Sequence, residues 1–129
     1  LIRGVCILIP NQAFSENIRV IRIIDRFLEH ARVFVFYNNG ENRLYMGSAD
    51  WMKRNLHRRI ECVFPVYDST IKQEVLDILN IQLNDNVKGR IVDEKLNNRC
   101  RDDVEAGCRS QLETYYYLQS KYNLSPDQQ

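Results

Sequence analysis

The feature that most constrains this chain is an uninterrupted apolar run, Val33–Phe36, that ends in a polar turn. Valine and phenylalanine favour strands, and an apolar run without alternation suits a strand that is covered on both faces. Asn38, Asn39 and Gly40 follow, and these residue types favour a chain reversal. Arg43–Met46 is typical of the return strand. The sequence therefore predicts two adjacent antiparallel strands.

Polar groups flank these two strands. His30 and Arg32 are two residues apart, so in an extended segment both side chains would lie on one face. The return strand runs into Gly47-Ser48-Ala49-Asp50, whose small side chains would let backbone N–H groups approach an anion. The pattern predicts an anion site. A histidine beside strands is more often structural than functional, and that interpretation stays open.

The length and composition are those of one globular domain. The chain has 129 residues, of which 44% are hydrophobic and 27% charged. It holds no apolar run near the roughly 18 residues of a spanning helix, and no secretory signal. It begins on LIRGVCILIP without Met, so we expect residues 1–129 to be one domain cut from a longer protein.

Cysteine spacing and charge narrow the function classes. The four cysteines lack CxxC spacing, which argues against a zinc site and for reduced thiols in a cytosolic protein. The expected location is the cytoplasm, including a peripheral place at the inner membrane. A net charge of +1 gives no reason to expect nucleic acid. Residues 1–59 carry 10 Lys and Arg against 5 Asp and Glu, and residues 60–129 carry 8 against 12. The basic half suits a phosphate-bearing ligand.

Two N-terminal stretches are informative. Leu1–Ile9 is typical of a buried strand, yet it contains Arg3, which must reach water or meet an anion. Ile18–Leu28 has helical spacing of its arginines but is rich in isoleucine, so helix and strand both stay open. The other expected elements are a helix Trp51–Leu56 capped by Asp50, a strand Ile60–Phe64, a helix Ser69–Leu83 capped by Asp68, a strand at Ile91 and Val92, and a helix Val104–Tyr122 ended by Asn123 and Pro126.

The polar groups have a known counterpart. His30 and Arg32 followed by Gly47–Asp50 resemble the phospholipase D-like pattern, in which HxK and a later GSxN converge on a phosphate. Two residues depart from it, because Arg32 replaces lysine and Asp50 replaces asparagine.

Over a longer span the chain resembles the last domain of the polyphosphate kinase family. The resemblance implies an α/β fold of phospholipase D-like type, with a mixed sheet flanked by helices, and it favours a strand at Ile18–Leu28. It covers about residues 2–90 and rests on the blocks RGVC, SENIRV, DRFLEHARVFVF, NNGENRLYMGSADWMKRNL, RRIE and LNDNVKGR.

The resemblance also implies roles for single residues. Arg3 would contact the phosphates of ATP, and His30 would line a tunnel as the catalytic group for phosphate binding or proton transfer. Arg32 and Ser48 are candidates for secondary phosphate contacts. No motif here matches the family's phosphorylated nucleophilic histidine, so the preceding catalytic domain would carry it. Mg²⁺ is implied for the full enzyme, with no metal ligand in this chain.

The expected function is thus part of an ATP:polyphosphate phosphotransferase that works reversibly with ATP, ADP and inorganic polyphosphate. Its partners would be the preceding domain of the parent chain and further copies in a homo-oligomer, and the fragment alone would be inactive. Two alternatives are a phospholipase D-type phosphodiesterase half-site and a non-catalytic polyphosphate-binding or assembly domain.

Overall fold

The computed structural model describes residues 1–4, 6–101 and 107–123. It confirms an α/β protein, and it divides the chain into two compact units. Unit 1 comprises residues 1–28 and 77–129, and unit 2 comprises residues 29–76. Within the described ranges, no helix combines the length and the apolar character that crossing a membrane requires.

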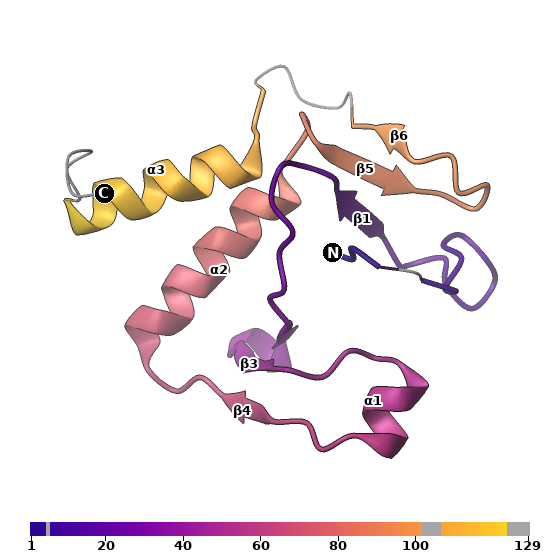
Figure 1. Cartoon of the computed structure of the whole chain (residues 1–129), viewed down its shortest axis with the longest axis horizontal. Coiled ribbons are helices and arrows are strands. Elements are labelled where there is room, and N and C mark those ends of the chain that lie inside the picture. Colours follow the sequence, from indigo (N-terminus) through magenta and orange to yellow (C-terminus); the bar gives the residue numbers. More distant parts are fainter. Residues whose placement is uncertain (5, 102–106, 124–129) are drawn as a thin grey trace. The chain divides into compact units, whose positions relative to one another are not determined.

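Unit 1 contains a three-stranded antiparallel sheet in the order β1-β5-β6 (Figure 1). Its strands are β1 (Val20–Ile23), β5 (Gly89–Val92) and β6 (Arg99–Cys100). Val20 pairs with Val92, and both side chains are buried with Ile21. Of the stretch Ile18–Leu28, the part Val20–Ile23 is therefore a strand, because β5 offers its branched side chains an apolar partner.

A buried carboxylate joins three parts of unit 1. Asp85 has no solvent-exposed surface, and its Oδ1 accepts bonds from the N–H groups of Val87, Lys88 and Gly89 at 3.1, 2.7 and 2.9 Å. Its Oδ2 accepts bonds from the N–H and hydroxyl of Ser110, at 2.8 and 2.7 Å. Burial, the largest single effect, would raise the pKa of Asp85, but these bonds together hold that pKa below its usual value. These hydrogen bonds therefore stabilise the ionised form of Asp85. Through its bonds from Ser110, Asp85 also caps the start of the next helix.

That helix is α3 (Ser110–Tyr122), and its first turn is tied back to the end of β1. Arg109 forms a two-pronged ion pair with Asp25, with nitrogen–oxygen distances of 2.6 and 2.8 Å. The amide of Gln111 donates to the carbonyl of Phe27 at 2.8 Å and accepts from its N–H at 3.0 Å. Residues more than 80 positions apart in the sequence are therefore held together.

Unit 2 contains a second three-stranded antiparallel sheet, β2-β3-β4. It comprises β2 (Val33–Phe36), the 3-10 turn η1 (Asn38–Gly40), β3 (Arg43–Gly47), the helix α1 (Lys53–Arg58) and β4 (Val63–Pro65). The predicted hairpin is confirmed, and Asn38, Asn39 and Gly40 all take positive φ. The division between the units falls within α2 (Ser69–Leu83), whose start is capped by Asp68 as predicted.

Several predictions about elements need correction. The predicted mixed sheet is wrong, since both sheets are antiparallel. Leu1–Ile9 forms no strand in its described part, where its backbone bond to β1 runs from Ile2 to Ile21 at 2.9 Å. Ile7 is 94% exposed, so this stretch is also not buried. The covering predicted for both faces of β2 is incomplete as well, because Phe36 is 54% exposed.

Two helix starts also differ. α1 begins after Met52, and no side chain caps this helix start. Asp50, which was predicted to cap it, binds Arg32 instead. The predicted start of the last helix at Val104 lies outside the described residues, and residues 107–109 are not helical.

Candidate functional site

His30 lies in the segment that leads into β2. Its side chain is exposed, and no residue in the described parts of the chain bonds to its imidazole. Its backbone carbonyl, in contrast, accepts a hydrogen bond from Nη1 of Arg32. Both residues precede β2, which starts at Val33, and so flank the strand as expected. The main chain of His30 is fixed while its ring faces solvent.

Arg32 is itself held by an ion pair across the sheet end. Its Nε lies 3.1 Å from Oδ1 of Asp50, and its Nη2 lies 3.4 Å from Oδ2. The Arg32 side chain is 28% exposed and that of Asp50 is 33% exposed. The hydrogen bond from Arg32 is the main cause that lowers the pKa of Asp50, with smaller contributions from the charges of Arg54 and His30. Asp50 is therefore an anion under neutral conditions and compensates the charge of Arg32.

Gly47 and Ser48 have backbone N–H groups that are already used. The Gly47 N–H donates to the carbonyl of Arg32 at 3.1 Å, and the Ser48 N–H donates to the carbonyl of Cys62 at 3.0 Å. A Cβ on Gly47 would lie 2.4 Å from the carbonyl oxygen of Cys62, so a glycine is required where β3 approaches the segment before β4. In this structure these two N–H groups complete the sheet.

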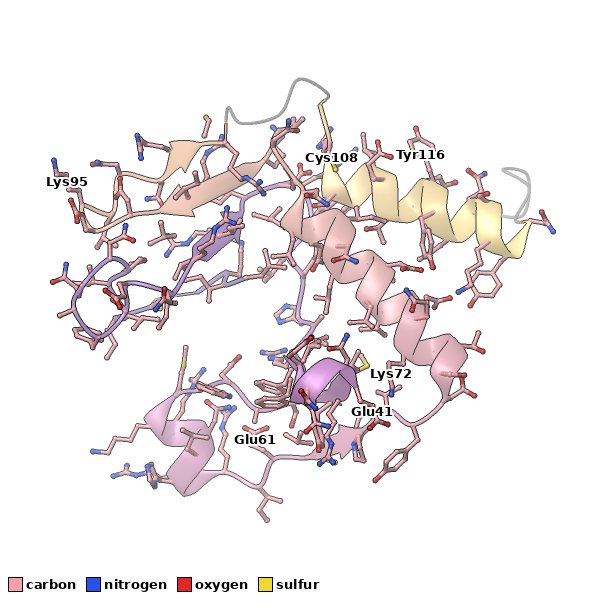
Figure 2. All side chains as sticks on the ribbon, turned by 180° about the vertical axis from the view of Figure 1, so that it is seen from behind. Glu41, Glu61, Lys72, Lys95, Cys108 and Tyr116 are labelled. Atoms are coloured by element: carbon pink, nitrogen blue, oxygen red, sulfur yellow. The ribbon has the colours of Figure 1, made fainter. Side chains whose placement is uncertain are left out.

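The hydroxyl of Ser48 belongs to a polar network with Glu61. It donates to Oε2 of Glu61 at 2.5 Å and accepts from the N–H of Cys62 at 3.2 Å. The amide of Asn55 donates to Oε1 of Glu61 at 2.6 Å. The hydrogen bonds from Ser48 and then Asn55 lower the pKa of Glu61, which lies between α1 and β4 (Figure 2). A phosphate approaching Ser48 would therefore meet a carboxylate.

Arg3 belongs to unit 1 and follows Ile2, which bonds to β1. Its side chain is exposed and has no bonding partner among the described residues. Of the four predicted site residues, the structure brings together Arg32 with the main chain of His30. Ser48 lies in the same unit, while Arg3 lies in the other.

Sequence reasoning missed the partners of these residues. Asp50 was expected to cap a helix, and neither Glu61 nor Asn55 was expected to join a network with Ser48. The only signal for Asp50 was an opposite charge 18 positions after Arg32, across the predicted hairpin. A separation of 18 positions identifies Asp50 as the partner of Arg32 only when the strand register, with Val33 opposite Met46, is known.

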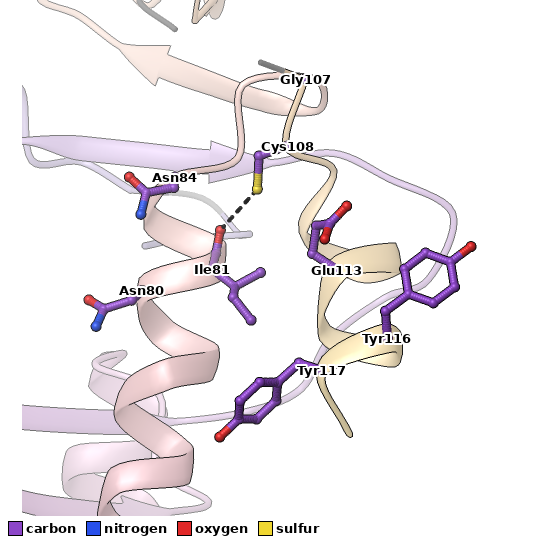
Figure 3. Close-up of a pocket in the computed structure, with 8 residues that line it drawn as sticks. All are labelled: Asn80, Ile81, Asn84, Gly107, Cys108, Glu113, Tyr116 and Tyr117. Carbon is purple, nitrogen blue, oxygen red and sulfur yellow. Dashed lines mark hydrogen bonds between the residues drawn. The ribbon is translucent and has the colours of Figure 1, made fainter. Parts of the chain in front are cut away.

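A separate open pocket of about 680 Å³ lies in unit 1 between α2 and α3 (Figure 3). The thiol of Cys108 bonds to the carbonyl of Ile81 at one end, and burial raises the pKa of that thiol. The other lining residues are Asn80, Asn84, Gly107, Glu113, Tyr116 and Tyr117. This lining carries one carboxylate and no cation, so it offers a phosphate no positive charge. In the described ranges, no three His, Cys, Asp or Glu side chains are grouped as a metal site would require.

Residues 1–111 match the family described as "Polyphosphate kinase C-terminal domain 2". The chain is 48% identical over 125 residues to the polyphosphate kinase of Escherichia coli K12, covering 93% of this chain and 18% of that protein. It is 49% identical to the polyphosphate kinase of Yersinia pestis over the same shares. The crystal structure of polyphosphate kinase from Porphyromonas gingivalis matches 95% of this chain and 19% of its own, with a TM-score of 0.90 and 45% identity. The chain thus spans about a fifth of these proteins.

Proposed function

The chain belongs to the polyphosphate kinase C-terminal domain 2 family, and from that premise we propose that it supplies one part of a phosphotransferase site. The reaction is the reversible transfer of the terminal phosphate of ATP to inorganic polyphosphate. The nucleophile and the rest of the site come from the preceding catalytic domain of the parent chain. The observation that carries the proposal is the family match over residues 1–111, which includes both Arg3 and His30.

The two residues suit the two demands of phosphoryl transfer. Such reactions depend on positioning and on neutralising the charge spread over the phosphoryl oxygens. Arg3 is exposed and lacks a partner among the described residues, so its forked N–H donors are available to a phosphate. His30 presents an exposed imidazole, and a histidine can take or release a proton near neutral pH. Arg3 would bind the nucleotide phosphate, and His30 would act on the transferred group.

The fold and the partners are proposed in the same way. The phospholipase D-like arrangement is supported by the spacing of His30, Arg32 and Ser48, although Ser48 now has Glu61 as a competing partner. A tunnel between the catalytic domains, assembly into a homo-oligomer and a cytoplasmic location with peripheral membrane contact remain predictions for the parent enzyme. Mg²⁺ is expected as the companion of ATP, and its ligands in the parent enzyme remain a prediction too.

The test uses the full-length parent enzyme. His30→Ala should lower the rate of polyphosphate synthesis from ATP by about 10²–10⁴-fold, the usual contribution of a general acid or base. Arg3→Ala should raise KM for ATP and also lower kcat, because it removes a contact to the reacting nucleotide. His57→Ala and Arg19→Ala are matched controls, since both side chains are exposed and neither is placed in the site.

Other outcomes would decide between the alternatives. Wild-type synthesis by both variants would refute the assignment, and intact polymer binding in such variants would support a non-catalytic assembly domain. A phosphohistidine trapped on His30 would support the phosphodiesterase half-site. The isolated 129-residue chain should show no transfer from ATP to polyphosphate.

A further inference from the structure

The guanidinium of Arg32 contacts two different groups within unit 2. Two of its nitrogens face the carboxylate of Asp50, at 3.1 and 3.4 Å, and the third donates to the carbonyl of His30. The carbonyl of Arg32 is held in turn by the N–H of Gly47 at 3.1 Å. Both the side chain and the main chain of Arg32 are therefore fixed to the end of β3.

This arrangement changes what Arg32 can offer to an anion. All three guanidinium nitrogens have acceptors inside the protein, and Asp50 compensates the positive charge. A two-pronged pair of this kind is stronger and more directional than a single contact between point charges. A phosphate that approached Arg32 would meet a guanidinium whose charge is already compensated by Asp50.

We propose that Asp50 and Arg32 are positioning residues that act through His30, by fixing the main chain from which its imidazole projects. The inference rests on the proposed function, because it assigns His30 the chemical role. It reassigns Arg32 from a phosphate contact to a clamp, meaning a side chain that holds the main chain of His30 in place. It also assigns Asp50 the role of holding that side chain. The carboxylate at this position is thus the partner that orients the clamp.

The geometry explains why such a clamp is needed. His30 lies in the irregular segment before β2, where no strand ladder holds its backbone. Its neighbour Glu29 and the ring of His30 are both exposed, so packing does not fix the segment. The hydrogen bond from Arg32 restrains the carbonyl of His30 directly, and misplacing a reacting group by about 1 Å can cost about 10²-fold in rate.

The test is steady-state kinetics of the full-length enzyme carrying Asp50→Asn or Arg32→Lys. If the pair positions His30, both variants should lower kcat by about 10-fold or more and leave KM for ATP and polyphosphate nearly unchanged. Lysine keeps the charge but cannot reach the carboxylate and the carbonyl together. Arg32→Lys also provides an independent answer if Asp50→Asn does not fold.

A phosphate-binding Arg32 would behave differently and would overturn the proposal. Asp50→Asn would then free the guanidinium and lower KM for the anionic polymer, and Arg32→Lys would retain most of kcat. Wild-type kinetics in both variants would overturn it as well.

A double-variant comparison separates positioning from general stability. In a His30→Ala background, Asp50→Asn should reduce the residual kcat no further, since its effect passes through the missing ring. A second, additional loss of kcat would contradict the clamp. Asp25→Asn is the matched control, because it removes the other two-pronged arginine pair and should lower the melting temperature without lowering kcat.

The chemical role of His30 and the positioning role of Asp50 and Arg32 are tested by different variants. If His30→Ala leaves synthesis intact, the proposed function of His30 is wrong. If His30→Ala abolishes synthesis while Asp50→Asn and Arg32→Lys are fully active, only the positioning role is wrong.

Discussion

The two units of the molecule use polar residues in opposite ways. In unit 1 two buried carboxylates link distant parts of the chain, as Asp85 does with Ser110 and Asp25 with Arg109. In unit 2 the ion pair of Arg32 and Asp50 joins residues 18 positions apart and stays partly open to solvent. Polar groups in unit 1 therefore maintain the fold, whereas those in unit 2 support an exposed side chain.

Among the described residues, both units bury few apolar side chains. Unit 1 buries Val20, Ile21 and Val92 between paired strands. Unit 2 buries Leu44 and Ala49 and leaves several aromatic side chains exposed, with Tyr37 at 75% and Trp51 at 79%. A unit with so small a core depends more on backbone pairing and local polar contacts, which is typical of segments that carry a site.

The largest expected effect comes from Asp85→Ala in unit 1. Five hydrogen-bond donors lose their acceptor. Since a buried unpaired polar group costs about 1–3 kcal/mol, we expect a loss of about 3–5 kcal/mol in the free energy of unfolding, measured by urea denaturation. Asp93→Ala is the control, because Asp93 also accepts backbone N–H bonds, from Lys95 and Asn97, but in contact with solvent. Equal losses in the two variants would contradict the special role of burial in unit 1.

An intermediate effect is expected from two glycines, one in each unit. A Cβ on Gly89 would lie 2.1 Å from the carbonyl oxygen of Asp85, and one on Gly47 would lie 2.4 Å from that of Cys62. Because backbone atoms must move in both cases, Gly89→Ala and Gly47→Ala should each cost about 1–3 kcal/mol. Gly4→Ala should be nearly neutral, since no atom lies within 4 Å of its Cβ position. Melting temperatures would check this. An unchanged melting temperature in Gly47→Ala would show that the backbone of unit 2 around Gly47 is not packed as closely as that of unit 1 around Gly89.

The smallest effect concerns acid. Hydrogen bonds from Arg109 and Arg32 are the main causes that lower the pKa of Asp25 and Asp50, so both pairs stabilise the folded state above the unfolded aspartate pKa of about 3.9. That stability is lost as the pH falls below this value towards the lowered pKa. Asp25→Asn and Asp50→Asn should each reduce the difference in urea midpoint between pH 7 and pH 3.

The pH-dependent difference in urea midpoint should fall more in Asp25→Asn than in Asp50→Asn. The side chain of Asp25 is 2% exposed, whereas that of Asp50 is 33% exposed. Exposed pairs are screened by solvent and contribute little. The opposite order would contradict the contrast between the two units.

Local signals predicted the elements that are determined locally. The helix α2 begins and ends as expected, because its apolar spacing and the Asp68 cap are both encoded within a few residues. The end of α3 was also predicted, since Asn123 adopts the left-handed conformation that suits a helix end. The start of α3 was not, because its cap is Asp85, which lies 25 positions earlier.

The candidate site divides in the same way. The closeness of His30 and Arg32 is apparent from their spacing, but the partner of Arg32 depends on how the hairpin is aligned. The short strand β6 was missed, since Arg99 and Cys100 show no strand pattern and pair because β5 lies beside them. Long-range pairing of this kind leaves no periodic trace in a sequence.

The bond between Gln111 and Phe27 matters to anyone who redesigns or shortens this domain. The Gln111 amide replaces the neighbouring strand that Phe27 lacks, and Phe27 lies three positions before His30. A version cut before Gln111 would keep every residue of the candidate site and still release the chain that leads to it. The first turn of α3 is therefore the minimal C-terminal limit for grafting or trimming, even though it touches no predicted site residue.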